Sequence, residues 1–256
     1  MIIDTHLHLN NLVNDSAELA VNELLKQMNK SKVLRAIVIH LEDQGWSKEE
    51  FSEAISKSKK LHGFVNINPY SGNANKELRN SIEKLNFIGL KIHPRIQKID
   101  LDDKRTDNLV RFAGEMNIPV IIDAFPDGIS LMEGFSVRKY ALLAKKNPNT
   151  RFIWAHCGGH YVIDFMLAAK RFKNVFMDIS YSLLYFMESN ISKDIIYAMK
   201  SMKFDKIMYG SDYPDRTIKE TITLSKKIMK KEKLNIKEIN KIFFLNAKNF
   251  FRWNDI

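Results

Sequence analysis

The sequence predicts a single (β/α)8 barrel with one extra helix at its C-terminal end, and it predicts that residues 1–256 form one domain. Three observations predict this fold class. Short β-rich runs alternate with longer helical runs eight times along the chain. The β-rich runs are almost continuously apolar, as in parallel strands covered by helices. A chain of 256 residues also has the usual size of such a barrel. A doubly wound sheet would hold the same elements, but eight repeated units favour a closed barrel.

The predicted strands are short runs of Val, Ile, Leu and Phe that end at a polar residue, a glycine or a proline. Pro69 closes the third run and Pro94 closes the fourth, and proline cannot continue a central strand. In chain order the eight predicted strands are residues 2–6, 33–40, 63–68, 87–93, 119–124, 151–156, 175–180 and 207–210.

Each predicted strand precedes a segment with apolar residues at helical spacing. Residues 16–29 show this spacing after the capping residues Asn14, Asp15 and Ser16. Ser47 and Glu50 form a capping-box pattern at the start of the next helix. The predicted helices are residues 16–29, 47–59, 75–85, 102–116, 134–146, 160–172, 190–202, 216–232 and 236–250.

Composition excludes several classes of function. The net charge is +10, but the lysines are scattered along helical segments and are not interleaved with aromatic residues, so we expect solvated helix faces and no nucleic-acid partner. Attraction of an anionic small-molecule substrate stays open. Cys157 is the only cysteine, which excludes an internal disulfide and suits a reducing cytoplasm. No signal peptide or membrane-spanning run is visible, so we expect a soluble, cytoplasmic protein. Homo-oligomer formation is left open.

Histidines and aspartates gather at the carboxyl ends of the predicted strands. In a barrel of this kind the reactive groups come from these ends and from the loops that follow them. Random surface histidines would not collect at one end of the elements. The residues in such positions are His6, His8, His40, His93, Asp123, His156, Asp178 and Asp212.

Imidazoles and carboxylates are the ligands of a catalytic divalent metal that keeps one position open for water. Such a metal lowers the pKa of its water to about 7, and a neighbouring carboxylate can accept the proton. His6 and His8 are separated by one residue, so in an extended chain they point to the same side. This pair therefore predicts half of a metal site.

Five segments, in order, carry a resemblance to a known family. They are Ile-Ile-Asp-Thr-His-Leu-His (2–8), Gly-Leu-Lys-Ile-His-Pro (89–94), Phe-Ile-Trp-Ala-His-Cys-Gly-Gly (152–159), Met-Tyr-Gly-Ser-Asp-Tyr-Pro (208–214) and Asn-Ala (246–247). The set spans nearly the whole chain and resembles the amidohydrolase superfamily. Within it, the closest likeness is to the amidohydrolase-2 branch of hydrolases, decarboxylases and lactonases.

The resemblance implies a role for each matching residue. His6 and His8 would be metal ligands, and Asp212 would be the strand-eight carboxylate that touches the metal and activates water. His156 would polarise the substrate or relay protons. Asn246 would fasten the last helix. The implied cofactor is one divalent metal, with zinc favoured and manganese as the alternative.

One position departs from the family pattern. The family usually has a histidine ligand at the end of strand five, where this chain has Asp123. A carboxylate still binds divalent metals, although it favours harder ones than imidazole does, so Asp123 stays a candidate ligand. The alternative is a metal-independent lactonase, a type that the same branch contains.

Four residues are candidate substrate contacts. Lys91 and His93 share a side of strand four, and the planar guanidinium of Arg95 can bind a carboxylate through two hydrogen bonds. Arg95 could instead be a surface residue. His40 could contact the substrate or only form a hydrogen bond within its loop.

The sequence thus predicts an enzyme that hydrolyses a small lactone, ester or amide with a metal-activated water at the C-terminal end of the barrel. One alternative is the non-oxidative decarboxylation of an unsaturated or aromatic acid. Another is a metal-independent lactonase or a non-catalytic binding barrel. Cys157 lacks a nucleophile's partner pattern, so we expect a buried structural thiol.

Overall fold

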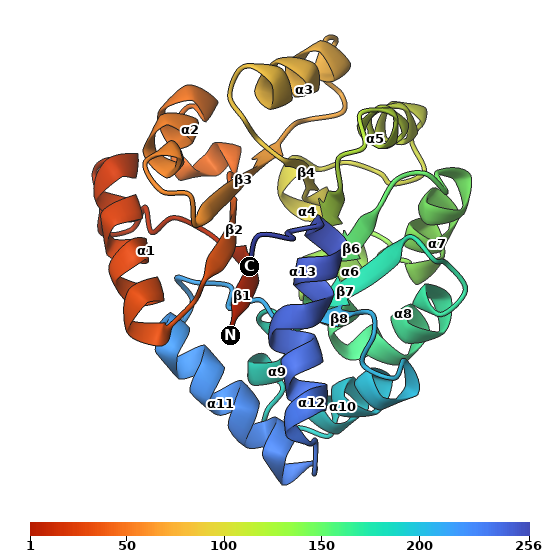
Figure 1. Ribbon diagram of the computed structural model, residues 1–256. Helices are drawn as coiled ribbons and strands as arrows, with labels where there is room; N and C mark the ends of the chain where they lie inside the picture. The colour runs from red at the N-terminus through yellow and green to blue at the C-terminus, as the bar shows by residue number, and fades with distance from the viewer.

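The computed structural model describes residues 1–256, and its eight parallel strands form a barrel surrounded by helices (Figure 1). Each strand pairs in parallel with the next one in the chain, so the predicted fold class is confirmed. All eight predicted strands are present. They are β1 Ile3–Leu7, β2 Arg35–Ile39, β3 Leu61–Asn66, β4 Gly89–Ile92, β5 Val120–Ile122, β6 Phe152–Trp154, β7 Val175–Asp178 and β8 Ile207–Met208.

The predicted helices lie between the strands and after β8. They are α1 Ala17–Ser31, α2 Lys48–Ser56, α3 Ala74–Glu83, α5 Lys104–Glu115, α7 Val137–Lys146, α8 Val162–Ala169, α10 Ile191–Ser201, α11 Ile218–Lys231, α12 Ile236–Asn240 and α13 Asn246–Phe251. A π-helical turn, Lys241–Leu245, joins the last two into one continuous segment. The predicted cap is formed at Ser16, and the predicted capping box is formed by Ser47 and Glu50. No helix of the structure is both long enough and apolar enough to cross a membrane.

Three short α-helices were not predicted, and each follows the carboxyl end of a strand. They are α4 Pro94–Gln97 after β4, α6 Gly128–Met132 after β5, and α9 Ser182–Tyr185 after β7. They are too short to show a helical period in the sequence. Their position matters because the loops at this end of the barrel shape the site.

The barrel closes between β8 and β1 through individual hydrogen bonds. The backbone N–H of Thr5 donates to the carbonyl of Tyr209 at 2.9 Å, and the N–H of Asp212 donates to the carbonyl of His6 at 2.8 Å. The expected proximity of the first and last strands is present, although β8 has only two residues and no regular ladder joins it to β1.

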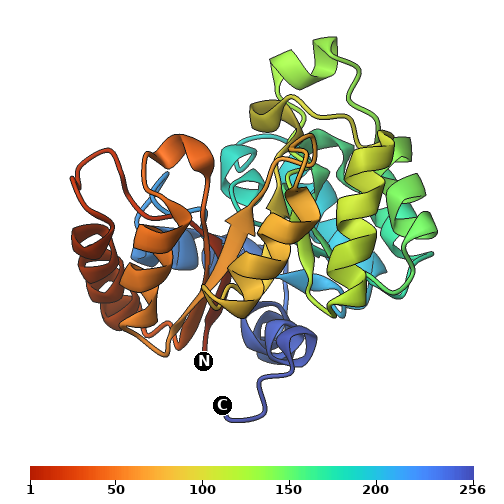
Figure 2. The same ribbon diagram turned by 90° about the horizontal axis from the view of Figure 1, so that it is seen from above.

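Two groups of buried side chains make up the core. The larger group fills the layer between the strands and the surrounding helices. The smaller group joins strand residues such as Ile3, Ile121 and Ile153 to Phe244 and Phe250 of the C-terminal segment. Figure 2 shows this segment lying below the strands, beside the N-terminus. The terminal helix therefore covers the N-terminal end of the barrel, opposite the end predicted to carry the site.

The segment after β6 differs from the prediction. The strand ends at Trp154, and the chain then turns through four residues with positive φ, from His156 (61°) to Gly159 (56°). A Cβ at Gly158 would lie 2.0 Å from the Phe165 ring, so the turn requires glycine there. Strand alternation therefore does not set the direction of Cys157, but its thiol is still buried in the layer under the helices, as expected.

Candidate active site

A cavity of about 320 Å³ lies among the predicted site residues, at the carboxyl ends of the strands. Its lining includes every predicted site residue except His40. Phe125, Asp127 and Tyr181 line it as well, and all three belong to loops after β5 and β7. The full lining is His6, His8, Lys91, His93, Arg95, Asp123, Phe125, Asp127, His156, Tyr181 and Asp212.

His6, His8 and Asp212 form one group of candidate metal ligands. His6 Nε2 lies 3.5 Å from Asp212 Oδ1, and His8 Nε2 lies 3.7 Å from the same oxygen. Ligands about 2.1 Å from a tetrahedral metal are separated by about 3.4 Å. His8 Nδ1 lies 3.1 Å from the carbonyl oxygen of Ile39. When Nδ1–H donates to this oxygen, Nε2 carries the lone pair and is free to bind a metal. The donor atoms and their spacing therefore fit a divalent metal.

Asp178 is the hydrogen-bond partner of His6 Nδ1, the ring nitrogen that does not face Asp212. His6 Nδ1 lies 3.0 Å from Asp178 Oδ2, and the other oxygen, Oδ1, accepts the backbone N–H groups of His156 and Ser180, both at 3.0 Å. Burial alone would raise the pKa of Asp178, but its interactions with His6, including their hydrogen bond, hold it well below its ordinary value. The residue is thus a buried carboxylate that orients two parts of the site. Its role was not predicted, although its place at the end of strand seven was the available signal.

His6 and His8 are in the form that binds metals. Burial is the main cause that lowers the pKa of each ring, and the Lys91 charge lowers both further. Both imidazoles are therefore neutral at pH 7, and a neutral ring nitrogen is the one with a lone pair for a metal.

Asp123 lies against two histidines instead of in the ligand group. Its Oδ2 lies 3.0 Å from His156 Nε2 and 3.5 Å from His93 Nε2. Burial opposes the charge on His156, but the hydrogen bond and charge of Asp123 prevail and raise the pKa of His156 to about 9. Asp123 is not part of the group formed by His6, His8 and Asp212, and its role as a metal ligand stays a prediction. Its carboxylate is the ion-pair partner of His156.

Lys91 is buried inside the barrel mouth, with only 1% of its surface exposed. Its Nζ lies 3.5 Å from His6 Nε2, and the charges of Asp123, Asp178 and Asp212 act on it. Burial lowers its pKa, and these carboxylates oppose that effect. Lys91 therefore places a buried amino group directly beside the candidate ligands, as expected from the side it shares with His93.

Arg95 and two aromatic residues border the cavity. Arg95 Nε lies 3.2 Å from Asp127 Oδ2, which ties α4 to the start of α6. The ring of Phe125 packs edge to face on Tyr181 at 5.0 Å and on His156 at 6.1 Å. Asp127 and Phe125 were missed because they lie in a loop without a periodic pattern or a motif.

His40 lies outside this cavity. It follows Ile39 in the chain, and Ile37 and Ile39 face the barrel interior, so His40 points with Ala36 and Val38 toward the helices. Its Nε2 lies 3.1 Å from the carbonyl oxygen of Trp46. Of the two interpretations of His40, the geometry favours the hydrogen bond within the loop, and we leave it out of the site.

Comparison with known proteins identifies the family. A family model described as amidohydrolase, of the amidohydrolase-2 type, matches residues 3–253. The chain belongs to this family. The resemblance seen in the sequence is therefore confirmed, and so is the expectation of an enzyme. A comparison with curated proteins gave no match to this amidohydrolase.

Solved structures share the fold of this amidohydrolase at low sequence identity. A probable 2-pyrone-4,6-dicarboxylic acid hydrolase from Acinetobacter baumannii with bound citric acid is 17% identical, with a TM-score of 0.72 over 98% of this chain and 99% of that one. An amidohydrolase from Burkholderia multivorans with bound zinc is 12% identical, with a TM-score of 0.69 over 98% and 99%. A 5-carboxyvanillate decarboxylase from Novosphingobium aromaticivorans with bound manganese is 14% identical, with a TM-score of 0.66 over 98% and 97%.

Asn246 has a structural role in this amidohydrolase. Its buried amide donates to the carbonyl oxygens of Phe204, at 2.5 Å, and Ile207, at 2.7 Å. These bonds fix the start of α13 to the segment that leads into β8. The residue thus fastens the last helix, as its match to the family motif implied.

Proposed function

We propose that this amidohydrolase hydrolyses a small lactone, ester or amide that carries a carboxylate, and that His6, His8 and Asp212 hold one divalent metal, preferably zinc. The observation that carries the proposal is the approach of two neutral imidazoles to one carboxylate oxygen, at 3.5 and 3.7 Å. The family match supports hydrolysis. A similar structure that contains zinc and another that contains manganese support a metal at this site.

A bound metal would polarise the substrate carbonyl and make water a nucleophile at neutral pH. Asp212 is the general base, because it borders the cavity and is 18% exposed, so water can reach its carboxylate. His156 is the electrophile. Asp123 keeps this ring protonated, and Asp123 and Ser180 occupy its two nitrogens, so the ring acts through its positive charge on an oxygen that gains negative charge.

Two cations recognise the substrate carboxylate in this proposal. The Arg95 guanidinium borders the cavity and can bind a carboxylate through two hydrogen bonds. The Lys91 ammonium lies deeper and adds a point charge. A substrate carboxylate would add a further counter-charge to these two cations when water is excluded, so we expect the site to favour an anion.

Decarboxylation of an aromatic or unsaturated acid is the second candidate. The aromatic wall of Phe125 and Tyr181 beside His156 favours it, because an aromatic ring would stack there. A similar structure that is a decarboxylase supports this alternative. Release of CO₂ distinguishes it from hydrolysis.

The test combines metal analysis with turnover. Protein purified without chelators should contain about one divalent ion per chain, and His6→Ala and Asp212→Asn should reduce that content. The matched control is His160→Ala, because His160 is exposed and lies outside the cavity. Turnover is followed on carboxylate-bearing lactones, esters and amides, together with CO₂ release from aromatic acids. Full activity in both site variants would reject the proposed site, and metal-free protein that still opens lactones would reject the metal.

A further inference from the structure

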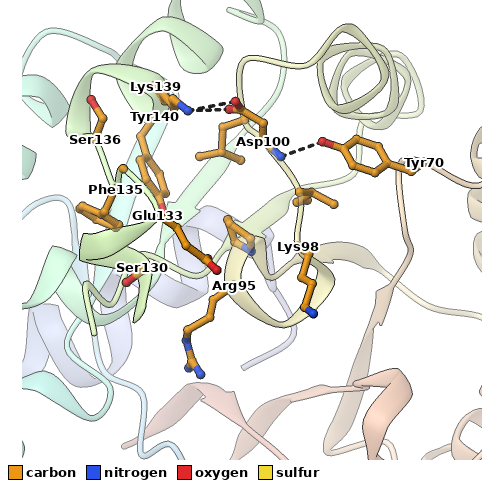
Figure 3. Close-up of a pocket in the computed structure, with 14 residues that line it drawn as sticks. Tyr70, Arg95, Lys98, Asp100, Ser130, Glu133, Phe135, Ser136, Lys139 and Tyr140 are labelled. Carbon is orange, nitrogen blue, oxygen red and sulfur yellow. Dashed lines mark hydrogen bonds and ion pairs between the residues drawn. The ribbon is translucent and has the colours of Figure 1, made fainter. Parts of the chain in front are cut away.

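A second cavity, drawn in Figure 3, shares the side chain of Arg95 with the active-site cavity. Its volume is about 410 Å³, and residues of α4, α6 and α7 line it. We call it the outer cavity and define it by Ile99, Leu101, Phe135, Tyr140 and Arg95. Arg95 also lines the active-site cavity, so the two spaces meet at this side chain.

Arg95 presents different parts of its side chain to the two cavities. Figure 3 shows the guanidinium pointing away from Tyr70 and Lys139, which stand on the far side of the outer cavity. Arg95 Nε lies 3.2 Å from Asp127, a residue that lines only the active-site cavity of the two. This Nε is buried and has no hydrogen bond of good geometry. The charged end therefore serves the active site, while the carbon chain forms part of the outer wall.

Part of the outer cavity's wall is apolar, and the rest is polar or charged. Phe135 and Tyr140 pack against each other at 5.6 Å, and Ile99 and Leu101 are buried behind the opening. Its charges are partly neutralised, because Lys139 Nζ binds both carboxylate oxygens of Asp100, at 2.9 and 3.0 Å. An apolar cavity of about 150 Å³ is enough to hold a benzene ring. The volume of about 410 Å³ therefore has room for one aromatic ring with its substituents.

We propose that the outer cavity is a second substrate compartment for an apolar group about the size of one aromatic ring. That group would be attached next to the carboxylate that Arg95 binds. The inference rests on the proposed function only in giving Arg95 a carboxylate. The substrates would be branched acids, with the reactive group near His6 and Asp212, the carboxylate at Arg95 and the branch between α4 and Phe135.

Two inert acids test the compartment without turnover. Phenylsuccinate and succinate both carry carboxylates, contain no bond that a hydrolase would cleave, and differ by one phenyl ring. Calorimetry on the full chain should show that phenylsuccinate binds about tenfold more tightly or better, because burying the ring removes its surface from water. Arg95→Met should weaken both acids.

A substitution that fills the outer cavity tests whether the phenyl ring binds there. Glu133 lines only the outer cavity of the two, is exposed, and its carboxylate forms no hydrogen bond or ion pair, so its replacement removes no interaction. Glu133→Trp should bring the affinity ratio of the two acids to about one and leave succinate unchanged. Glu133→Gln is the matched control and should keep the ratio. If the Trp variant unfolds in a thermal scan, Phe135→Ala provides a second test by removing part of the apolar wall.

The outcomes are distinct from those of the proposed function. Equal affinity of the wild type for the two acids, or no binding of either at millimolar concentration, would overturn the second compartment. A phenyl preference that persists in the folded Glu133→Trp or Phe135→Ala variant would also overturn it. Loss of turnover in the His6 and Asp212 variants would still support the hydrolase in each of these cases.

Discussion

His6 Nδ1 lies 3.0 Å from Asp178 Oδ2, so a buried carboxylate on β7 orients a candidate metal ligand on β1. The same carboxylate accepts the backbone N–H of His156 at 3.0 Å. The Asp178 side chain thus orients both the His6 ring, a candidate metal ligand, and the turn that carries His156, the proposed electrophile. Residues that orient metal ligands in this way commonly affect metal binding strongly.

Replacing Asp178 with asparagine should distinguish its role in orienting His6 and His156 from a role in packing alone. The amide has nearly the same shape as the carboxylate but no charge, and only its oxygen can accept a hydrogen bond, because its nitrogen is a donor. We expect metal affinity and activity to fall by about 10- to 100-fold. Competition with a coloured chelator measures the affinity. Asp43→Asn, at an exposed position, is the control, and unchanged affinity in Asp178→Asn would contradict the orienting role.

Asp123 controls the protonation of His156. With Asp123 present the pKa of His156 is about 9, because the carboxylate outweighs the effect of burial. In Asp123→Asn the effect of burial is opposed only by the more distant Asp212 and Asp178, so we expect the pKa of His156 to fall. An NMR titration of the imidazole in metal-free protein measures the change. A pKa of His156 that stays near 9 in the variant would show that a group other than Asp123 raises it.

His62, at the start of β3, makes stability depend on pH. Its ring packs on Trp253 at 4.7 Å, and burial, aided by the Arg35 charge, lowers its pKa to about 4. The unfolded chain binds this proton near pH 6.5 and the folded chain near pH 4. Its contribution to stability is therefore complete above pH 6.5 and is lost as the pH falls toward 4.

Replacing His62 with phenylalanine should remove this loss. The phenyl ring can keep the packing on Trp253, and His62 Nε2 has no hydrogen-bond partner to lose. We expect the wild type to lose about 1–2 kcal/mol more than the variant between pH 7 and pH 4, after allowance for partial exposure of the ring. Urea unfolding at the two pH values measures the difference. Parallel losses in the two proteins would show that other groups cause the acid sensitivity.

Asn246 should matter for stability and not for chemistry. Its side chain satisfies the carbonyl oxygens of Phe204 and Ile207, and Asn246→Ala leaves both without this donor. We expect a loss of about 2 kcal/mol in the free energy of unfolding, seen as a lower Tm. Asn249→Ala is the matched control, because Asn249 lies on the same helix and is exposed. Equal Tm values for the two variants would refute the fastening role.

The local pattern of the chain was enough to predict the barrel. Eight apolar runs separated by helical periodicity predict the strands, because burial on both faces leaves a continuous hydrophobic signal. The motif at residues 2–8 and the position of Asp212 after the last run predict neighbours, since a closed barrel brings its first and last strands together. The direction of Lys91 also followed, because strand residues alternate sides.

Only the tertiary structure decided what these groups touch. Asp123 stands where the family has a metal ligand, yet its carboxylate pairs with His156, because the left-handed turn after β6 directs that ring toward β5. Asp178 and Asp127 acquired partners through contacts between residues far apart in the chain, and no sequence period encodes such contacts. The sequence therefore determined which strand ends carry the chemistry. The folded loops determined which nitrogen and oxygen atoms meet, because turn geometry and long-range packing set those directions.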